Sequence, residues 1–252
     1  MAVQLVTGAD THLINAQNTS KLNLTMSTVA GASTSFSVNV WIKANWGSTA
    51  AGVGRISLVG IYGPSPNPTS ALQIGGTLGN GDLACWTWGG GVLVRVADDF
   101  MVPYNNVWVN VGYTYNGTTH RLYVDGLEVA NSTAAQAAGN LQLVTINGYP
   151  GGGASETYNH IVDSYALWNR VLSPSEMSVV YYAFGARHSI VNGQVAGYEF
   201  DEGTEGSNVG AASVIDTAGN GLTLLLTGAG TAPKYTYTTS FATANIRTVQ
   251  IQ

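Results

Sequence analysis

The sequence predicts an all-β protein, built as a sandwich of two antiparallel sheets with one short helix. Apolar and polar side chains alternate with a period of two in several segments, and turn-forming pairs such as Asn-Gly and Asp-Gly separate those segments. Many short alternating strands with such turns between them are typical of sandwiches and barrels. Because β-sandwiches of 252 residues are commonly single domains, we expect one domain over residues 1–252.

The first well-defined strand is predicted at residues 36–44, FSVNVWIKA. Phe36, Val38, Val40 and Ile42 share one face, and the residues between them share the other. This alternation indicates a half-buried strand, with one face in the core and one in solvent.

A three-stranded meander is predicted at residues 107–130. The segment VWVNVGYTY ends at the turn pair Asn116-Gly117, RLYV returns, and Asp125-Gly126 leads into LEVA. We interpret Asp125 as a turn residue that tolerates positive φ, rather than as a ligand.

One helix is predicted near residues 174–184, in SPSEMSVVYYAFG. Ser173 is the expected N-cap, Pro174 suits the first helical position, and Glu176 can complete a capping box. Gly185 can end the helix after about three turns.

Composition limits the function classes. Only 9% of the residues are charged, against about 25% in typical soluble proteins, which indicates an extracellular or particle-bound protein. A net charge of −5 with nine basic residues argues against nucleic-acid binding, and no run of about 18 apolar residues suggests a membrane span. The single cysteine, Cys85, allows no internal disulfide and is expected to be a small buried residue.

The first ten residues, MAVQLVTGAD, lack the charged start and apolar stretch of a secretory signal. Exterior-type composition without export signal or disulfide fits a virus component that is assembled in the cytoplasm and released by lysis. A host-exported protein whose signal has been removed is the alternative.

Three segments resemble a laminin-G-like domain of the concanavalin A-like lectin/glucanase superfamily, as found in phage virion proteins. They are FSVNVWIKA at residues 36–44, WVNVGYTYNGTTHRLYVDGLEV at 108–129 and IVDSYALWNRVLSPSEMSVVYY at 161–182. The resemblance covers about residues 10–185 and implies a jelly-roll sandwich.

The remaining segments flank this match. Residues 195–228 resemble the start of such domains, and we interpret them as permuted strands that complete the sheets; a second, truncated repeat is the alternative. Residues 1–9 and 229–252 are predicted to be terminal arms. Short alternating segments in both arms suggest that they add strands to a neighbouring molecule.

The stretch AGYEFDEGTEG at residues 196–206 tests the glucanase possibility that the resemblance raises. Glu199 and Asp201 match the first two positions of the family's catalytic Glu-x-Asp-x-x-Glu pattern, but Thr204 occupies the third and Glu205 is displaced. Retaining chemistry needs two rigidly placed carboxylates about 5–5.5 Å apart. We therefore expect no enzymatic activity and no catalytic residues.

A calcium site is the second chemical possibility, in this stretch and the turn that follows it. Asp201, Asp216 and Asn220 are conceivable calcium ligands, but Asp, Gly and Asn also favour an ordinary turn, which we prefer. We expect no metal site and no cofactor, with calcium as the alternative. The four histidines, which show no zinc-binding spacing, are His12, His120, His160 and His188.

Trp86 and Trp88, in ACWTWGGG, are the predicted carbohydrate-binding residues. They project to one face of a strand, and the glycines that follow leave room for a sugar ring to stack on an indole. Packing in the core or in a subunit contact is the alternative.

Together these features predict a non-enzymatic virion protein of a tailed phage, in a head decoration, fibre or tail, with a glycan-adhesive role. Its expected location is the virion, extracellular after lysis. Its expected partners are further copies in a homo-oligomer, other virion proteins and cell-surface glycan, with no nucleic acid or membrane. A secreted carbohydrate-binding, lectin-like module is the alternative.

Overall fold

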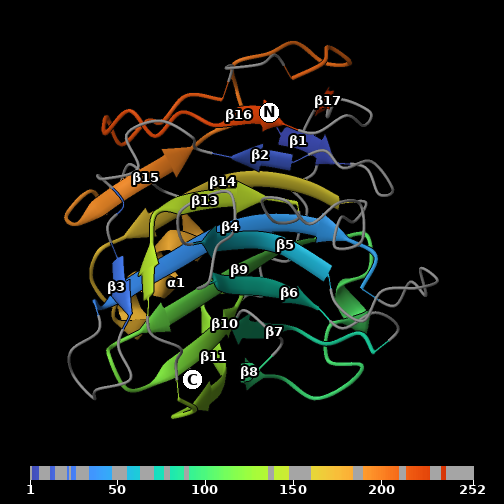
Figure 1. Cartoon of the computed structure of the whole chain (residues 1–252). Coiled ribbons are helices and arrows are strands. Elements are labelled where there is room, and N and C mark those ends of the chain that lie inside the picture. Colours follow the sequence, from blue (N-terminus) through green and yellow to red (C-terminus); the bar gives the residue numbers. More distant parts are fainter. Residues whose placement is uncertain are drawn as a thin grey trace, which may run out of the picture.

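The chain folds as a two-layer β-sandwich in the computed structural model, and Figure 1 shows the two layers lying face to face. The structure describes residues 2–5, 12–14, 22, 24–26, 34–46, 56–62, 71–76, 80–87, 91–135, 139–147, 160–183, 190–209, 214–227 and 234–236. The predicted fold class, a jelly-roll sandwich of antiparallel sheets with one short helix, is confirmed for these residues.

The larger sheet has eight strands, and every pair in it is antiparallel. In spatial order they are β11 (Leu127–Ser132), β10 (His120–Val124), β9 (Trp108–Tyr115), β4 (Phe36–Ala44), β14 (His160–Trp168), β1 (Ala2–Leu5) and β17 (Lys234–Thr236), while β15 (Gln194–Tyr198) also pairs with β14.

The second sheet has seven antiparallel strands. In spatial order they are β16 (Leu225–Thr227), β2 (His12–Ile14), β13 (Leu143–Ile146), β5 (Ile56–Tyr62), β6 (Ala71–Gly76), β7 (Ala84–Thr87) and β8 (Val92–Arg95). The remaining elements are a two-stranded sheet of β3 (Leu24–Met26) and β12 (Gly139–Leu141), the 3₁₀ helix η2 (Val102–Tyr104) and the helix α1 (Pro174–Tyr182). No helix among the described residues has the length and hydropathy to span a membrane.

The main core lies between the two large sheets. The alternate residues predicted from β4 all belong to it, as do Val109, Val111, Tyr113 and Tyr115 of β9, and from the opposite sheet Ile61, Leu72 and Cys85 pack against them. Burial of Cys85 confirms its expected role as a small core residue. Each fully buried aliphatic or aromatic side chain contributes about 1.5–3 kcal/mol by leaving water.

The outer face of β4 is buried as well, so the prediction of a half-buried strand is wrong. Ser37 and Asn39 are fully buried, and the amides of Asn39 and Asn110 exchange two hydrogen bonds of 2.8 Å. A second cluster of buried side chains covers this face, and it consists of Tyr123, Ala166, Trp168, Leu172, Met177, Val180 and Ile190. The helix α1 therefore forms a third layer over part of the sheet.

The start of α1 is as predicted. Ser173 caps the helix and accepts from the backbone N–H of Glu176, whose carboxylate accepts from the backbone N–H of Ser173 at 2.8 Å. Arg170 binds the same carboxylate with two nitrogens at 2.7 and 3.1 Å, and together with the cap this lowers the pKa of Glu176 to about 2. The helix ends at Tyr182, and Gly185 lies outside the described residues.

The predicted meander is also confirmed, as β9, β10 and β11. Asp125 and Gly126 both have positive φ, 51° and 77°, as a type I′ hairpin turn requires. Asp125 therefore has the structural role that was expected, as a turn residue with positive φ.

The N-terminal strand corrects one expectation. Residues 2–5 were predicted to add to a neighbouring molecule, but β1 pairs with β14 on one edge and with β17 on the other, so both of its edges are occupied within the chain. The far C-terminal segment 246–252 lies outside the described residues. Residues 195–228 supply β15 to one sheet and β16 to the other; the division of the chain into domains stays a prediction.

Candidate functional site

Glu199 and Asp201, the two acidic residues that match the glucanase pattern, do not lie on a strand. β15 ends at Tyr198, before both Glu199 and Asp201, and Phe200 between them is fully buried with φ 56°. Glu202 accepts the backbone N–H of Ile215 at 2.9 Å. Glu199 and Asp201 thus lie in an irregular segment, without the regular alternation of a strand that would place both side chains on one face.

Asp216 anchors a turn. Its Oδ1 accepts the backbone N–H groups of Gly197 (3.1 Å) and Ala218 (3.0 Å), and its Oδ2 accepts those of Asn220 (2.9 Å) and Leu222 (3.1 Å). Asn220 donates its amide to the Val195 carbonyl at 3.1 Å. Four N–H groups aimed at one carboxylate use its four lone-pair directions.

The turn interpretation therefore agrees with these contacts better than the calcium alternative does. Within the described residues, no three His, Cys, Asp or Glu side chains gather as a metal site requires. Calcium binding stays untested, at this turn and elsewhere.

Trp86, the first of the two predicted tryptophans, is not exposed to solvent. Trp86 on β7 is only 2% exposed, so no sugar ring can reach its indole in this conformation. This is the buried alternative considered for the residue. Trp88 lies outside the described residues, and its role in sugar binding stays a prediction.

A buried chain of hydrogen bonds links Tyr113 of β9, His120 of β10 and the backbone of Ala134. The Tyr113 hydroxyl lies 2.6 Å from His120 Nδ1, and His120 Nε2 lies 3.1 Å from the Ala134 carbonyl oxygen. If Nε2 carries the proton, Tyr113 donates to Nδ1 and every polar atom of the imidazole is satisfied. Burial lowers the pKa of His120, because the charged form would lose its hydration.

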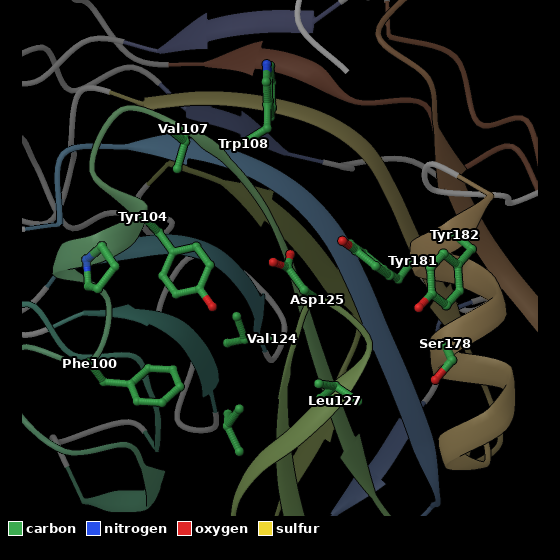
Figure 2. Close-up of a pocket in the computed structure, with 12 residues that line it drawn as sticks. Phe100, Tyr104, Val107, Trp108, Val124, Asp125, Leu127, Ser178, Tyr181 and Tyr182 are labelled. Atoms are coloured by element: carbon green, nitrogen blue, oxygen red, sulfur yellow. The ribbon is translucent and has the colours of Figure 1, made fainter. Parts of the chain in front are cut away.

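An aromatic groove lies at the end of the sheet where the β10–β11 turn meets α1. It has a volume of about 510 Å³, within the range of small-ligand sites. Figure 2 shows η2 and its flanking residues on one side, α1 on the other, and Asp125 between them. Its lining residues are Phe100, Pro103, Tyr104, Val107, Trp108, Val124, Asp125, Leu127, Val129, Ser178, Tyr181 and Tyr182.

The first wall comes from the connection between β8 and β9. It is pinned to the sandwich, since Met101 donates to the Gly81 carbonyl at 2.7 Å and Asn106 to the Ala44 carbonyl at 2.8 Å. A Cβ on Gly81, whose φ is 58°, would lie 2.6 Å from a methyl of Val102. Glycine at position 81 therefore permits the close approach of Val102 in this connection.

The second wall is the last turn of α1. Tyr181 stacks on Trp41 of the sheet, with ring centroids 5.7 Å apart and planes 21° apart, and Tyr182 lies 5.0 Å from Tyr181 at 58°. Tyr182 is 68% exposed. One tyrosine therefore fixes the helix end while the other presents its ring to solvent.

The β10–β11 turn forms the base between the walls. Asp125 Oδ1 accepts the backbone N–H of Asn110 at 3.0 Å, and Ser178 donates its hydroxyl to the Gly126 carbonyl at 3.3 Å. A Cβ on Gly126 would lie 3.0 Å from the Cβ of Tyr181, so the turn packs directly on α1. The carboxylate is held in a fixed position at the groove.

This arrangement combines aromatic faces, hydroxyl groups and one carboxylate in a concave site. Aromatic rings stack on the apolar face of a sugar, and the polar groups bind its hydroxyls. The groove was not predicted from the sequence, because the three segments that line it, 100–108, 124–129 and 178–182, come together only in the folded chain. The consecutive tyrosines at the end of the predicted helix were the one local signal.

Comparisons with known proteins agree with the fold. The family model described as the concanavalin A-like lectin/glucanases superfamily, of the laminin-G type, matches residues 16–178, well over half of the chain. This confirms the resemblance to the superfamily seen in the sequence, and the phage-virion context stays a prediction. Among curated proteins, no sequence matches this chain.

Several solved structures share the architecture. A Bacteroides ovatus protein described as a candidate carbohydrate-binding protein has a TM-score of 0.55 and 14% identity over 93% of this chain and 61% of its own, so the chain spans about three fifths of that protein. A heptameric SAP-like pentraxin from Limulus polyphemus has a TM-score of 0.50 and 14% identity over 74% and 83%. Trypanosoma rangeli sialidase has a TM-score of 0.46 and 16% identity over 61% and 23%. At these identities the first two matches show the fold alone, and the sialidase match, with a TM-score below 0.5, supports no conclusion.

Proposed function

Because the chain belongs to the concanavalin A-like lectin/glucanase superfamily, we propose that it is a non-enzymatic glycan-binding protein whose binding site is the aromatic groove between η2 and α1. The observation that carries this proposal is the composition of the groove. Five aromatic rings line it, together with the fixed carboxylate of Asp125 and the hydroxyl of Ser178.

The geometry supports binding rather than catalysis. Glycoside hydrolysis in its common form needs two facing carboxylates, whereas the described lining of the groove contains one, Asp125. The acidic residues Glu199 and Asp201 belong to another part of the fold, beyond the end of β15. A groove with one carboxylate can orient a hydroxyl but lacks the second group for acid–base work.

The proposal fits both biological settings considered for the sequence. A phage-surface protein would use the groove for adhesion to cell-surface glycan, and a secreted module would use it on an extracellular polysaccharide. The phage role rests on composition, since only 9% of the residues are charged. The capture of assembled phage particles by the purified protein, or its failure, would separate the two settings.

The test is a Tyr182→Ala variant screened beside the unaltered chain on a glycan panel, with affinities then measured by calorimetry. Loss of one stacking ring, worth about 0.5–1.5 kcal/mol beyond buried area, should weaken binding about 2- to 13-fold. Val191→Ala is the matched control, because Val191 is also 68% exposed but does not line the groove. Equal binding by the Tyr182 variant, or no glycan bound by the unaltered chain, would refute the proposal.

A further inference from the structure

The charge of the groove points to its ligand class. We infer that the groove takes uncharged sugars and discriminates against glycans that carry a carboxylate or a sulfate, such as those ending in sialic or uronic acid. The inference rests on the proposed function and goes further, because glycan binding alone leaves the ligand charge open.

The lining supplies the first argument. Among the described residues, the twelve that line the groove include one carboxylate, that of Asp125, and no lysine, arginine or histidine. Recognition of an anionic sugar relies on charge-assisted hydrogen bonds, for which a guanidinium is the best donor. The groove contains the hydroxyl groups of Tyr104, Tyr181 and Tyr182, which suit neutral hydroxyl and amide groups. The Ser178 hydroxyl already donates to the Gly126 carbonyl and can only accept from a ligand.

The second argument is that Asp125 cannot retreat from a bound anion. Its side chain accepts the Asn110 N–H, its own N–H donates to the Asn110 carbonyl at 2.9 Å, and the turn that carries it is packed under α1. A ligand anion about 5 Å from this carboxylate is disfavoured about fourfold even at the dielectric constant of water, and more strongly in a less hydrated groove. A neutral sugar instead gains by donating its hydroxyls to the same carboxylate.

The basic side chains on neighbouring strands are the third consideration. Arg121 of β10 is paired with Glu128 of β11 at 3.3 Å, and Arg170 is held by Glu176. Lys43 lies across from Trp108 in the β4–β9 register but is not part of the lining. Lys43 is therefore the cation whose influence the experiment has to separate from that of Asp125.

The experiment measures affinities for matched pairs of oligosaccharides, each neutral chain beside the same chain ending in sialic or uronic acid, at low and high salt. We expect the acidic member to bind at least about fourfold more weakly, with a gap that narrows at high salt because salt screens the repulsion. Asp125→Asn should narrow the gap at low salt. Asparagine is nearly isosteric, tolerates positive φ and keeps the oxygen that accepts from Asn110.

The possible results are distinguishable. Equal or tighter binding of acidic glycans that Tyr182→Ala weakens would overturn the charge inference and leave the proposed function standing. An unchanged gap in Asp125→Asn would overturn it too. If acidic glycans bind at least as tightly as neutral ones, and Lys43→Gln lowers the affinity for the acidic ones alone, the lysine and not the carboxylate governs charge selection. The inference is then wrong. Absence of any binding, or binding that ignores Tyr182→Ala, would overturn the proposed function and with it this inference.

Discussion

Replacing Asp216 by asparagine is the sharpest test of how the segment after β15 is held. The carboxylate, only 6% exposed, accepts four backbone N–H groups, two on each oxygen. Asparagine keeps the size and one oxygen, but its amide nitrogen is a donor and would face two N–H groups that are donors themselves. Two hydrogen bonds are lost without any change in volume.

The magnitude follows from those two orphaned groups. A buried N–H left without an acceptor costs about 1–3 kcal/mol, so Asp216→Asn should lower the free energy of unfolding by about 2–6 kcal/mol. For a chain of this size 1 kcal/mol moves Tm by about 2–4 °C, which gives a fall of roughly 4–24 °C. Such a loss is a large share of the 5–15 kcal/mol typical of native proteins.

Urea unfolding followed by tryptophan fluorescence at pH 7 measures this loss. Glu205→Gln is the matched control, since it removes one negative charge from an exposed residue nearby and should change the free energy by less than about 0.5 kcal/mol. A change equally small in Asp216→Asn would show that the four contacts do not hold the turn. A calcium-dependent rise in Tm that the variant abolishes would instead make Asp216 a metal ligand.

Two further predictions concern His120 and the helix cap. Since burial lowers the pKa of His120, the unfolded chain binds its proton first, and stability should fall by up to about 1.4 kcal/mol per pH unit as pH drops below about 6.5 until the folded-state pKa is reached. His120→Gln should flatten that loss between pH 7 and 5 in denaturation curves, and an equally steep loss in the variant would exclude His120 as its source. Ser173→Ala removes the N-cap of α1 and should cost about 0.5–2 kcal/mol in the same assay, whereas Ser175→Ala, two residues further on, should cost less; equal costs would contradict the capping role.

Local features of the fold were predictable from sequence because their physics is local. The capping box at Ser173 and Glu176 needs residues three apart, and the turn at Asp125 and Gly126 needs two neighbours that tolerate positive φ. The alternation in β4 likewise identified which side chains face the core.

The alternation could not show what covers the other face. Ser37 donates to the carbonyl of Arg170 and accepts from the N–H of Leu172, contacts that span more than half of the chain. The same limit applies to Trp86: strand parity gives the face on which an indole lies but not its exposure. The groove was missed for this reason as well, since its residues are brought together by the docking of α1 on the β10–β11 turn.

The far edge of β14 has a consequence for the order of folding. In one half of that edge Val162 of β14 pairs with Val3 of β1, and in the other half Tyr165 of β14 pairs with Tyr198 of β15. β1 then needs β17 to cover its second edge, which joins Gln4 to Lys234. Contacts between such distant positions require a large loop-closure entropy and are slow to form, so we expect local hairpins such as β9–β10 to form early and β1 to join the sheet among the last strands.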